Sequence, residues 1–538
     1  MQKLLLLGDE AIAQGALDGG MSGVYAYPGT PSTEITEYVQ ANKYAAENNI
    51  HSDWSANEKT AVEAALGMSY AGKRSMTCMK HVGLNVAADA FVNAAITGVN
   101  GGMLVVVADD PSMHSSQNEQ DSRFYAKFAM IPVLEPANQQ EAYDMAYQAF
   151  ELSEKLKVPV MLRITTRLAH SRSGVTLKPQ LPQNDNSLPS DLRQFVLLPA
   201  IARRNYKALL SNQVNMEAEA ENSPFNVYTD GEDKSVGIIA CGIAHNYLME
   251  NFPEGNIKHP VLKMSHYPMP RKQVTRMLEE CDKIMVLEEG APVLEEMLKG
   301  YQEAGTPIMG RLDGTLPRDG ELTPNLVAKA IGLNTTTEEK IPEIVRNRPP
   351  AMCQGCGHIE AYTALNQALE EYGAGRVFAD IGCYTLGALP PYNAINSCVD
   401  MGASITMAKG AADAGLVPSV AVIGDSTFTH SGMTGLIDCV SEKTPVTIII
   451  SDNFTTAMTG GQDSKALGPL EDIVKGIGVE PEHIRVFRPT KKNLDEMVDI
   501  MKEELAYKGV SVIIPRRQCV QTMKNKKLAE RIKELGLK

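Results

Sequence analysis

The chain has 538 residues, more than one hydrophobic core normally holds, which predicts three or four domains. Its formal charge is −14, from 51 basic and 65 acidic residues, and this balance argues against nucleic acid as a partner. Apolar runs such as MLVVVA are far too short to cross a membrane, and the start, MQKLLLLGDEA, is too short for a signal peptide. We therefore expect a cytoplasmic protein whose nine cysteines are reduced thiols, metal ligands or core residues.

Strand-like and helix-like stretches alternate along the chain, which predicts a multidomain α/β protein. Residues 1–180 contain the strand candidates KLLLLGD, SGVYAYPG, SMTCMK, GMLVVVADD and VPVMLRIT. Residues 181–234 are proline-rich and then acidic, so they predict a linker that is helical only around 199–211. A smaller α/β domain is expected at 235–330, with the strand candidates SVGIIACG, HPVLKMSH and KIMVLEEG, and a second linker at 331–350.

The last predicted domain, residues 351–538, contains the strand candidates RVFADIG, SVAVIGD, VTIIISD, HIRVFRP and GVSVIIPR. Asp425 ends the second of these strands, and Asn453 follows the third, 28 positions later. Parallel strands joined by a crossover helix place both side chains at the carboxyl edge of a sheet. Together with a backbone carbonyl, for which Thr455 is the best candidate, they form a hard-oxygen site that suits Mg²⁺ bound to phosphates. Gly-Asp and Asp-Asn also favour ordinary turns, but the pair at this spacing favours a thiamine diphosphate site.

Four cysteines are candidate metal ligands: Cys353, Cys356, Cys383 and Cys519. A Cys-x-x-Cys pair alone fits zinc, a redox dithiol or chance, and a single cysteine after a strand is most simply a small buried residue. Cys383 and Cys519 each follow a predicted strand, at the edge that also holds Asp425. Four thiolates that meet there are what a [4Fe–4S] cluster requires. The other five are predicted to be core residues: Cys78, Cys241, Cys281, Cys398 and Cys439.

The first domain offers groups for the organic part of the cofactor and for a substrate. Thiamine diphosphate needs a carboxylate beside its pyrimidine ring. Glu58 is the candidate, in the first turn of a predicted helix after an Asn57 cap, with Glu63 as the competitor. A glutamate there also simply complements the helix dipole. The loop YPGTPST, which contains Thr30, suits either a small anion or an ordinary helix cap.

Two further segments that follow strands carry basic side chains. Lys80 and His81 lie in KHVGLN, and Arg123 ends the stretch ADDPSMHSSQNEQDSR. An arginine there is able to bind the carboxylate of a 2-oxo acid in a bidentate pair. These residues are therefore substrate-side candidates.

The motifs together resemble the 2-oxoacid:ferredoxin oxidoreductases, and within that family most nearly the indolepyruvate:ferredoxin oxidoreductase alpha subunits. The resemblance lies in YPGTPSTE, NEKTAVEAALG, MKHVGLNVAAD, CQGCGH, ADIGCYTLG, GDSTFTHSG and DNFTTAMTGGQ, in the family's order over almost the whole chain. It implies two doubly wound parallel-sheet domains that bind the pyrimidine and the diphosphate of thiamine diphosphate. It also implies a smaller transketolase-C-like domain between them.

The resemblance also assigns roles to individual residues. It makes Glu58 the catalytic pyrimidine partner and makes Asp425, Asn453 and the Thr455 carbonyl the Mg²⁺ ligands. Further cofactor contacts are expected from Gly424, Ser426, Cys383 and Tyr384. The ligands of one [4Fe–4S] cluster are expected to be Cys353, Cys356, Cys383 and Cys519. Substrate contacts are expected from Thr30, Lys80, His81 and Arg123.

The activity implied is oxidative decarboxylation of an aryl 2-oxo acid such as indolepyruvate. Electrons would pass through the cluster to ferredoxin and the acyl group to coenzyme A, with a smaller beta- or gamma-type subunit and an oligomeric assembly. The alternatives are a non-oxidative 2-oxoacid decarboxylase and a scaffold or regulatory subunit that binds the cofactor without turnover. Alpha subunits of the family usually continue into a ferredoxin-like domain. No C-x-x-C-x-x-C-x-x-x-C-P run occurs before Lys538, so either the sequence is truncated or a separate carrier takes the electrons.

Overall fold

The computed structural model describes residues 2–189, 191, 194–301, 306–335, 342–346, 351–398 and 400–537. The chain divides into two compact units, Met1–Glu339 (the N-terminal unit) and Lys340–Lys538 (the C-terminal unit). Parts of the predicted linker 331–350 lie outside the described residues, at 336–341 and 347–350. Within the part of the chain that is described, no helix has both the length and the apolarity to cross a membrane.

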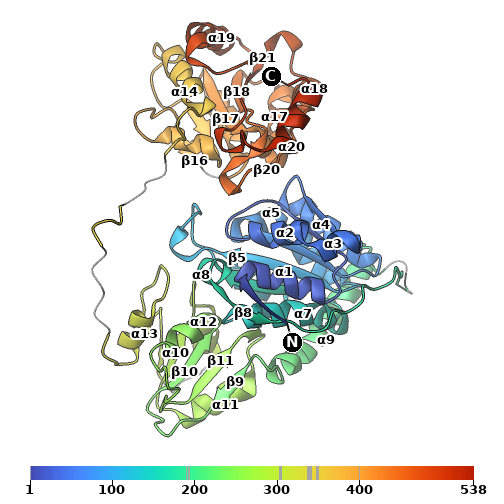
Figure 1. Cartoon of the computed structure of the whole chain (residues 1–538), viewed down its shortest axis with the longest axis vertical. Coiled ribbons are helices and arrows are strands. Elements are labelled where there is room, and N and C mark those ends of the chain that lie inside the picture. The colour runs from blue at the N-terminus through green and yellow to red at the C-terminus, as the bar shows by residue number, and fades with distance from the viewer. Residues whose placement is uncertain are drawn as a thin grey trace. The chain divides into compact units, whose positions relative to one another are not determined.

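The main sheet of the N-terminal unit has seven strands in the order β12-β6-β7-β5-β4-β2-β3, all parallel except the edge strand β12. Figure 1 labels β5, a central strand of this sheet. Its central strands are buried on both faces, and their continuous apolar runs are typical of parallel sheets. The strands are β2 (Gly23–Ala26), β3 (His51–Trp54), β4 (Ser75–Lys80), β5 (Met103–Asp109), β6 (Val133–Leu134), β7 (Val160–Thr165) and β12 (His266–Tyr267).

Helices cover both faces of this sheet. Along β5, Leu104 and Val106 belong to the core under α1, α2 and α7, whereas Val105 and Val107 belong to the core under α4, α5 and α6. This alternation is the period of two of a strand between two helical layers, so the domain is doubly wound. The helices are α1 (Gly8–Asp18), α2 (Thr33–Ala41), α3 (Lys43–Glu47), α4 (Glu58–Tyr70), α5 (His81–Thr97), α6 (Arg123–Ala129), α7 (Gln139–Leu156) and α8 (Thr166–Ala169).

Two smaller sheets complete the N-terminal unit. The predicted strand KLLLLGD is present as β1 (Lys3–Leu7), but it pairs antiparallel with β8 (Arg172–Thr176) rather than joining the main sheet. The smaller α/β part has a five-stranded sheet in the order β14-β13-β10-β11-β9, and both large cores continue into it. Its elements are β9 (Val227–Thr229), β10 (Gly237–Cys241), α10 (Ala244–Met249), β11 (Val261–Met264), α11 (Arg271–Glu280), β13 (Ile284–Leu287), α12 (Val293–Tyr301), β14 (Ile308–Met309) and α13 (Pro324–Ala330).

The helix expected only around 199–211 is longer than predicted. Helix α9 (Pro199–Glu221) continues through the acidic stretch NMEAEAE, and β9 follows within the same predicted linker. Alanine, methionine and glutamate are good helix formers, and Leu209, Met216 and Ala220 recur on one buried face. The acidic composition that indicated a linker is the solvated face of this helix.

The C-terminal unit has a sheet of six parallel strands in the order β16-β15-β17-β18-β22-β21. All five strands predicted here are present. Its central strand β17 turns Val420 and Val422 toward α14 and α19, and Ala421 and Ile423 toward α15, α17 and α18, so this domain is also doubly wound. The strands are β15 (Val377–Ala379), β16 (Ser397–Cys398), β17 (Ser419–Gly424), β18 (Val446–Ser451), β21 (Ile484–Phe487) and β22 (Val510–Pro515). Between and after them lie α14 (Gly357–Ala368), α15 (Ala403–Asp413), α16 (Asp425–Thr427), α17 (Met433–Glu442), β19 (Thr455–Thr456), β20 (Gln462–Asp463), α18 (Leu470–Ile477), α19 (Leu494–Ala506) and α20 (Lys526–Glu534).

Candidate functional site

Two neighbouring strand ends of the C-terminal unit hold Asp425 and Asn453. Strands β17 and β18 are parallel, and their last residues, Gly424 and Ser451, are register partners. The buried Asp425 carboxylate accepts hydrogen bonds from the backbone N–H groups of Asn453 and Ser426. The two predicted Mg²⁺ ligands therefore meet at the carboxyl edge of the sheet, where open α/β sheets bind ligands.

The Asp425 carboxylate is buried with one oxygen, Oδ2, that lacks a hydrogen bond within the described residues. Burial, and then the negative charge of Asp452, raise the pKa of the Asp425 carboxyl to about 8. Asp452 is itself buried, with the Arg516 guanidinium 2.7 Å from its carboxylate. Two buried carboxylates with one unpartnered oxygen fit a divalent cation, which would relieve both the desolvation and the repulsion.

The turn after β18 fixes the Asn453 side chain. Phe454 has a left-handed φ of 67°, and the Thr455 N–H then donates to Asn453 Oδ1 at 3.1 Å. The buried Thr455 hydroxyl donates to the carbonyl of Gln462 at 2.7 Å. Cation binding by the Thr455 carbonyl stays a prediction.

The aromatic ring of Tyr384 lies against Gly424, the last residue of β17. A Cβ atom at Gly424 would lie 2.8 Å from the ring of Tyr384, so only glycine allows this approach. The Tyr384 hydroxyl donates to the buried Asp380 carboxylate, which also accepts from Ser404 Oγ at 2.6 Å. Burial raises the pKa of Asp380 to about 6. Sequence reasoning missed Asp380 and Asp452, although both directly follow predicted strand cores, in ADIG and SDN.

Four cysteines line one cavity of about 210 Å³ in the C-terminal unit: Cys353, Cys356, Cys383 and Cys519. Cys383 begins a 3-10 helix shortly after β15, and Cys519 lies in the loop after β22. Asn453 lines the same cavity, and its carbonyl accepts a hydrogen bond from the Cys519 N–H at 3.2 Å. The predicted cluster cysteines thus converge beside the predicted Mg²⁺ site.

The spacing of these sulfur atoms is wider than a single zinc ion requires. A zinc–sulfur bond of about 2.3 Å in tetrahedral geometry puts sulfurs roughly 3.8 Å apart. Within the described residues, no three cysteine sulfurs lie within 4.8 Å of one another. A four-iron cluster is larger than one ion, so its thiolates stand further apart. Which metal centre the four thiols bind stays a prediction.

The groups around the thiols suit a bound cation. Burial raises the pKa of the Cys383 thiol to about 12 and also raises that of Cys356, and the neighbouring thiols add to both. His358 Nδ1 lies 3.4 Å from Cys356 Sγ, and burial lowers the pKa of this histidine to about 4. The Gln521 amide donates to Cys353 Sγ at 3.1 Å. Crowded, buried thiols become thiolates most readily when a metal neutralises them.

The other cysteines divide differently from the prediction. Cys78, Cys241, Cys281 and Cys439 are buried, as expected of core residues. Cys398 is exposed, so the prediction that it belongs to the core is wrong. It lies at the end of β16, the edge strand, which pairs on one side only among the described residues.

Glu58 occupies a buried position in the N-terminal unit. It is the first residue of α4, after Asn57, whose side chain caps the helix by accepting from the Thr60 N–H at 2.9 Å. A Cβ atom at Gly83 would lie 2.6 Å from Glu58 Oε1, so the carboxylate lies directly against helix α5. Glu63, the competitor, has a side chain that is 46% exposed and pairs with Lys59 on the same helix. Its exposure makes Glu63 the weaker candidate.

Lys80 lies close to both Glu58 and Thr30. Its Nζ donates to the Ser115 carbonyl at 3.0 Å, and the Ser115 hydroxyl donates to the Thr30 carbonyl at 3.2 Å. Burial lowers the pKa of Lys80 to about 8, against the opposing charges of Asp110 and Glu58.

His81 has a different surrounding. It is buried, and its Nε2 lies 3.2 Å from the Asn118 side-chain oxygen. Three of the four substrate-side candidates are thus grouped around the start of α5, although contact with a substrate stays a prediction.

Arg123, the fourth candidate, has a structural environment. It is fully buried, and every guanidinium nitrogen donates to a protein oxygen: Nε and Nη2 to Asp121, and Nη1 to Glu288 at 3.0 Å and the Tyr267 hydroxyl at 3.1 Å. No donor remains for a substrate carboxylate, so the predicted substrate role is not supported. Glu288 is 165 positions away in the chain, and sequence reasoning had no means of placing it here.

Comparison with known proteins identifies the family. The model described as pyruvate flavodoxin/ferredoxin oxidoreductase, thiamine diphosphate-binding, matches residues 14–197, and that of the thiamine pyrophosphate enzyme C-terminal domain matches 380–514. The indolepyruvate oxidoreductase subunit IorA of Archaeoglobus fulgidus is 38% identical over 547 residues, covering 96% of this chain and 86% of its own. The chain belongs to the IorA family. The IorA subunit of Pyrococcus abyssi is also 38% identical, with the same coverage.

The chain is thus a subunit of a thiamine diphosphate-dependent oxidoreductase, as its motifs predicted. Glu58 lies in the first matched range of this IorA-family chain, and Asp425, Asn453 and Cys383 lie in the second. Among solved structures, a 2-oxoglutarate:ferredoxin oxidoreductase from Magnetococcus marinus aligns with 61% of this chain and 65% of its own, at 18% identity and a TM-score of 0.49.

Proposed function

We propose that this chain is the alpha-type subunit of an oxidoreductase that decarboxylates an aryl 2-oxo acid such as indolepyruvate. Electrons leave through one [4Fe–4S] cluster to ferredoxin, and the acyl group leaves on coenzyme A. The curated relatives are named as indolepyruvate oxidoreductase subunits, which supports this substrate class and a partner subunit, here expected to be the smaller beta- or gamma-type chain of an oligomer.

One observation supports the redox activity over simple decarboxylation. Four cysteines line a cavity that Asn453 also lines. Asn453 directly follows the buried Asp452, and its backbone N–H donates a hydrogen bond to the Asp425 carboxylate. A non-oxidative decarboxylase needs no such cavity. When bound, thiamine diphosphate supplies the electron sink for decarboxylation, and an iron–sulfur cluster accepts the electrons singly.

The residues then have separable roles. Asp425, Asn453 and Thr455 would hold Mg²⁺ and, through it, the diphosphate, while Gly424 and Ser426 let the backbone approach it. Glu58 would hold the proton at the pyrimidine ring. Lys80, positively charged below pH about 8, would orient the substrate carboxylate.

Iron content tests the proposal. Protein purified without oxygen from cells that assemble clusters should carry about four irons per chain. Cys353→Ser, Cys356→Ser, Cys383→Ser and Cys519→Ser should each lower that number. Cys439→Ser is the matched control, because Cys439 is buried in α17 and does not line the cavity.

Activity separates the two enzymatic alternatives. The proposal requires that loss of iron abolishes reduction of ferredoxin in the presence of indolepyruvate and coenzyme A. Zinc without iron, together with release of the free aldehyde from the 2-oxo acid, would instead establish a non-oxidative decarboxylase.

A further inference from the structure

Three side chains that no step above uses meet in the N-terminal unit. Asp9 lies in the first turn of α1, Glu34 in the first turn of α2, and His170 at the end of α8. Each of these helices directly or closely follows a strand: β1, β2 and β7, respectively. The α1–α8 contact depends on Gly8, because a Cβ atom there would lie 2.3 Å from the Leu168 carbonyl oxygen.

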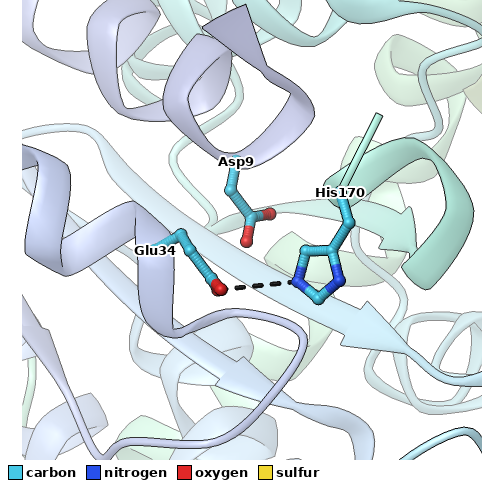
Figure 2. A group of neighbouring side chains, drawn as sticks. All are labelled: Asp9, Glu34 and His170. Atoms are coloured by element: carbon cyan, nitrogen blue, oxygen red, sulfur yellow. Dashed lines mark ion pairs between the residues drawn. The ribbon is translucent and has the colours of Figure 1, made fainter. Parts of the chain in front are cut away.

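The three side chains point toward one another (Figure 2). One ligand atom from each lies within 4.8 Å of the others. Glu34 Oε2 and His170 Nε2 are 3.6 Å apart, and both side chains are about a third exposed, at 36% and 35%. Asp9 is fully buried behind them. The cluster therefore has a closed inner end and an outer end open to solvent.

Asp9 is the observation that points to a ligand. Neither of its carboxylate oxygens has a hydrogen-bond partner among the described residues. Burial raises its pKa well above the ordinary value, and the charges of Glu34 and Glu10 raise it further. A buried carboxylate with no partner is costly, and either a proton or a cation is needed to neutralise it.

No cationic side chain meets that need within the described residues. Glu34 has an ion pair only with His170, and Arg172 pairs with Glu10 at 3.6 Å rather than with Asp9. Glu10, which is paired with Arg172, also accepts a hydrogen bond from the Leu7 N–H at 2.8 Å. Among the residues that the structure describes, the only group in the cluster able to carry a positive charge is the His170 imidazole, and imidazole is also the commonest metal ligand.

We infer that Asp9, Glu34 and His170 bind one divalent transition-metal ion, of which Zn²⁺ is the best fit. Carboxylate oxygen and imidazole nitrogen are both zinc ligands, and the exposed side leaves a fourth position for water, as in zinc sites with three protein ligands. A divalent ion balances the two carboxylate charges with a neutral histidine. The ion fastens α1, α2 and α8 together, and α2 begins three residues after Thr30. It therefore holds the loop that leads into the candidate substrate region.

A difference in zinc stoichiometry tests this inference. Full-length protein saturated with thiamine diphosphate and Mg²⁺ is dialysed against ZnCl₂, and bound zinc is counted by mass spectrometry. Asp9→Asn, Glu34→Gln and His170→Ala should each bind one zinc fewer per chain than the wild type. Zinc taken up by the thiol cavity is common to all variants and cancels in the difference.

His259→Ala is the matched control, because His259 lies 3.7 Å from the single carboxylate of Asp233 and should retain full zinc. Crystals soaked in ZnCl₂ should also show an anomalous peak among the three side chains. Equal zinc in all variants and no peak would overturn the inference. The inference would also be overturned if the wild type bound no zinc at this site and Asp9→Asn had a higher melting temperature. Asp9 would then simply keep a proton.

Discussion

The backbone N–H of Cys519 donates a hydrogen bond to the carbonyl oxygen of Asn453, with 3.2 Å between nitrogen and oxygen. One residue belongs to the thiol cavity and the other to the proposed Mg²⁺ site. The contact joins the loop after β22 to the loop after β18, two neighbouring strands of one sheet. Because both loops leave the same edge, the sheet sets the distance between the two proposed centres.

Removal of the Asp425 carboxylate should weaken cofactor binding. Asp425 is the only charged member of the predicted Mg²⁺ ligand set. Loss of a group that only hydrogen-bonds to a metal ligand already lowers metal affinity by about 10–100-fold. Asp425→Ala should therefore weaken Mg²⁺-dependent thiamine diphosphate binding by about 100-fold or more, as measured by calorimetry. Asp438→Ala, an exposed acid on α17, should bind like the wild type. Equal affinity in both variants would refute the site.

The close contact of Gly83 with Glu58 predicts a catalytic defect from a small substitution. In Gly83→Ala the new methyl group would lie 2.6 Å from Glu58 Oε1 and force the carboxylate to move, so turnover should fall by about 10²–10⁴-fold, as in Glu58→Gln. Exchange of the C2 proton of bound thiamine diphosphate for deuterium should slow equally in both variants.

Two controls accompany that experiment. Gly67→Ala, in α4, meets nothing within 4 Å and should stabilise the protein by about 0.5–1 kcal/mol without changing turnover. Glu63→Gln should also keep wild-type exchange, because Glu63 is exposed. Normal exchange in Glu58→Gln and slow exchange in Glu63→Gln would reverse the assignment.

Lys80 should give the activity an alkaline limit. Its pKa of about 8 means that the ammonium loses its proton above pH 8, so substrate affinity should fall there. Lys80→Arg keeps its charge and should remove this limit. Lys80→Met should raise KM by about 10–150-fold at pH 7, the value of a charged hydrogen bond.

The stability of the fold should change with pH in the opposite direction. The pKa of Lys80 is lower in the folded protein than the ordinary value of 10.5, so the unfolded state binds more protons between pH 8 and 10.5. The wild type should therefore gain stability relative to Lys80→Met as pH rises through this range. A loss of activity that parallels unfolding would contradict the substrate role of Lys80.

Arg123 should prove essential for stability rather than for substrate binding. Arg123→Met leaves Asp121 and Glu288 buried without their cation, and breaking such a pair costs about 3–5 kcal/mol. Urea unfolding should show this loss. A variant of normal stability with a raised KM would instead restore the predicted substrate contact.

The fold class and most of the strands follow from the amino-acid pattern alone. Strands such as MLVVVAD and SVAVIG are continuous apolar runs of strand length, and their burial between two helical layers follows from that pattern. Short or polar strands gave no such signal: HSDW forms β3, which pairs with β2. The acidic half of α9 was not predicted to be helical. Its buried residues, Met216 and Ala220, are few among the acidic and polar ones, which determine the composition of this stretch.

The same division holds for the site. Asp425 and Asn453 could be placed together because each lies within two residues of the end of a parallel strand, and strand ends are fixed by local sequence. Whether a charged side chain is free for a ligand depends on partners that are distant in the chain. Arg123 is paired with Glu288, Asp425 lies near Asp452, and Asp9 meets His170 only in the folded unit. Burial and charge pairing are properties of the packed structure, so the tertiary structure alone decided which of the candidate groups have partners and which do not.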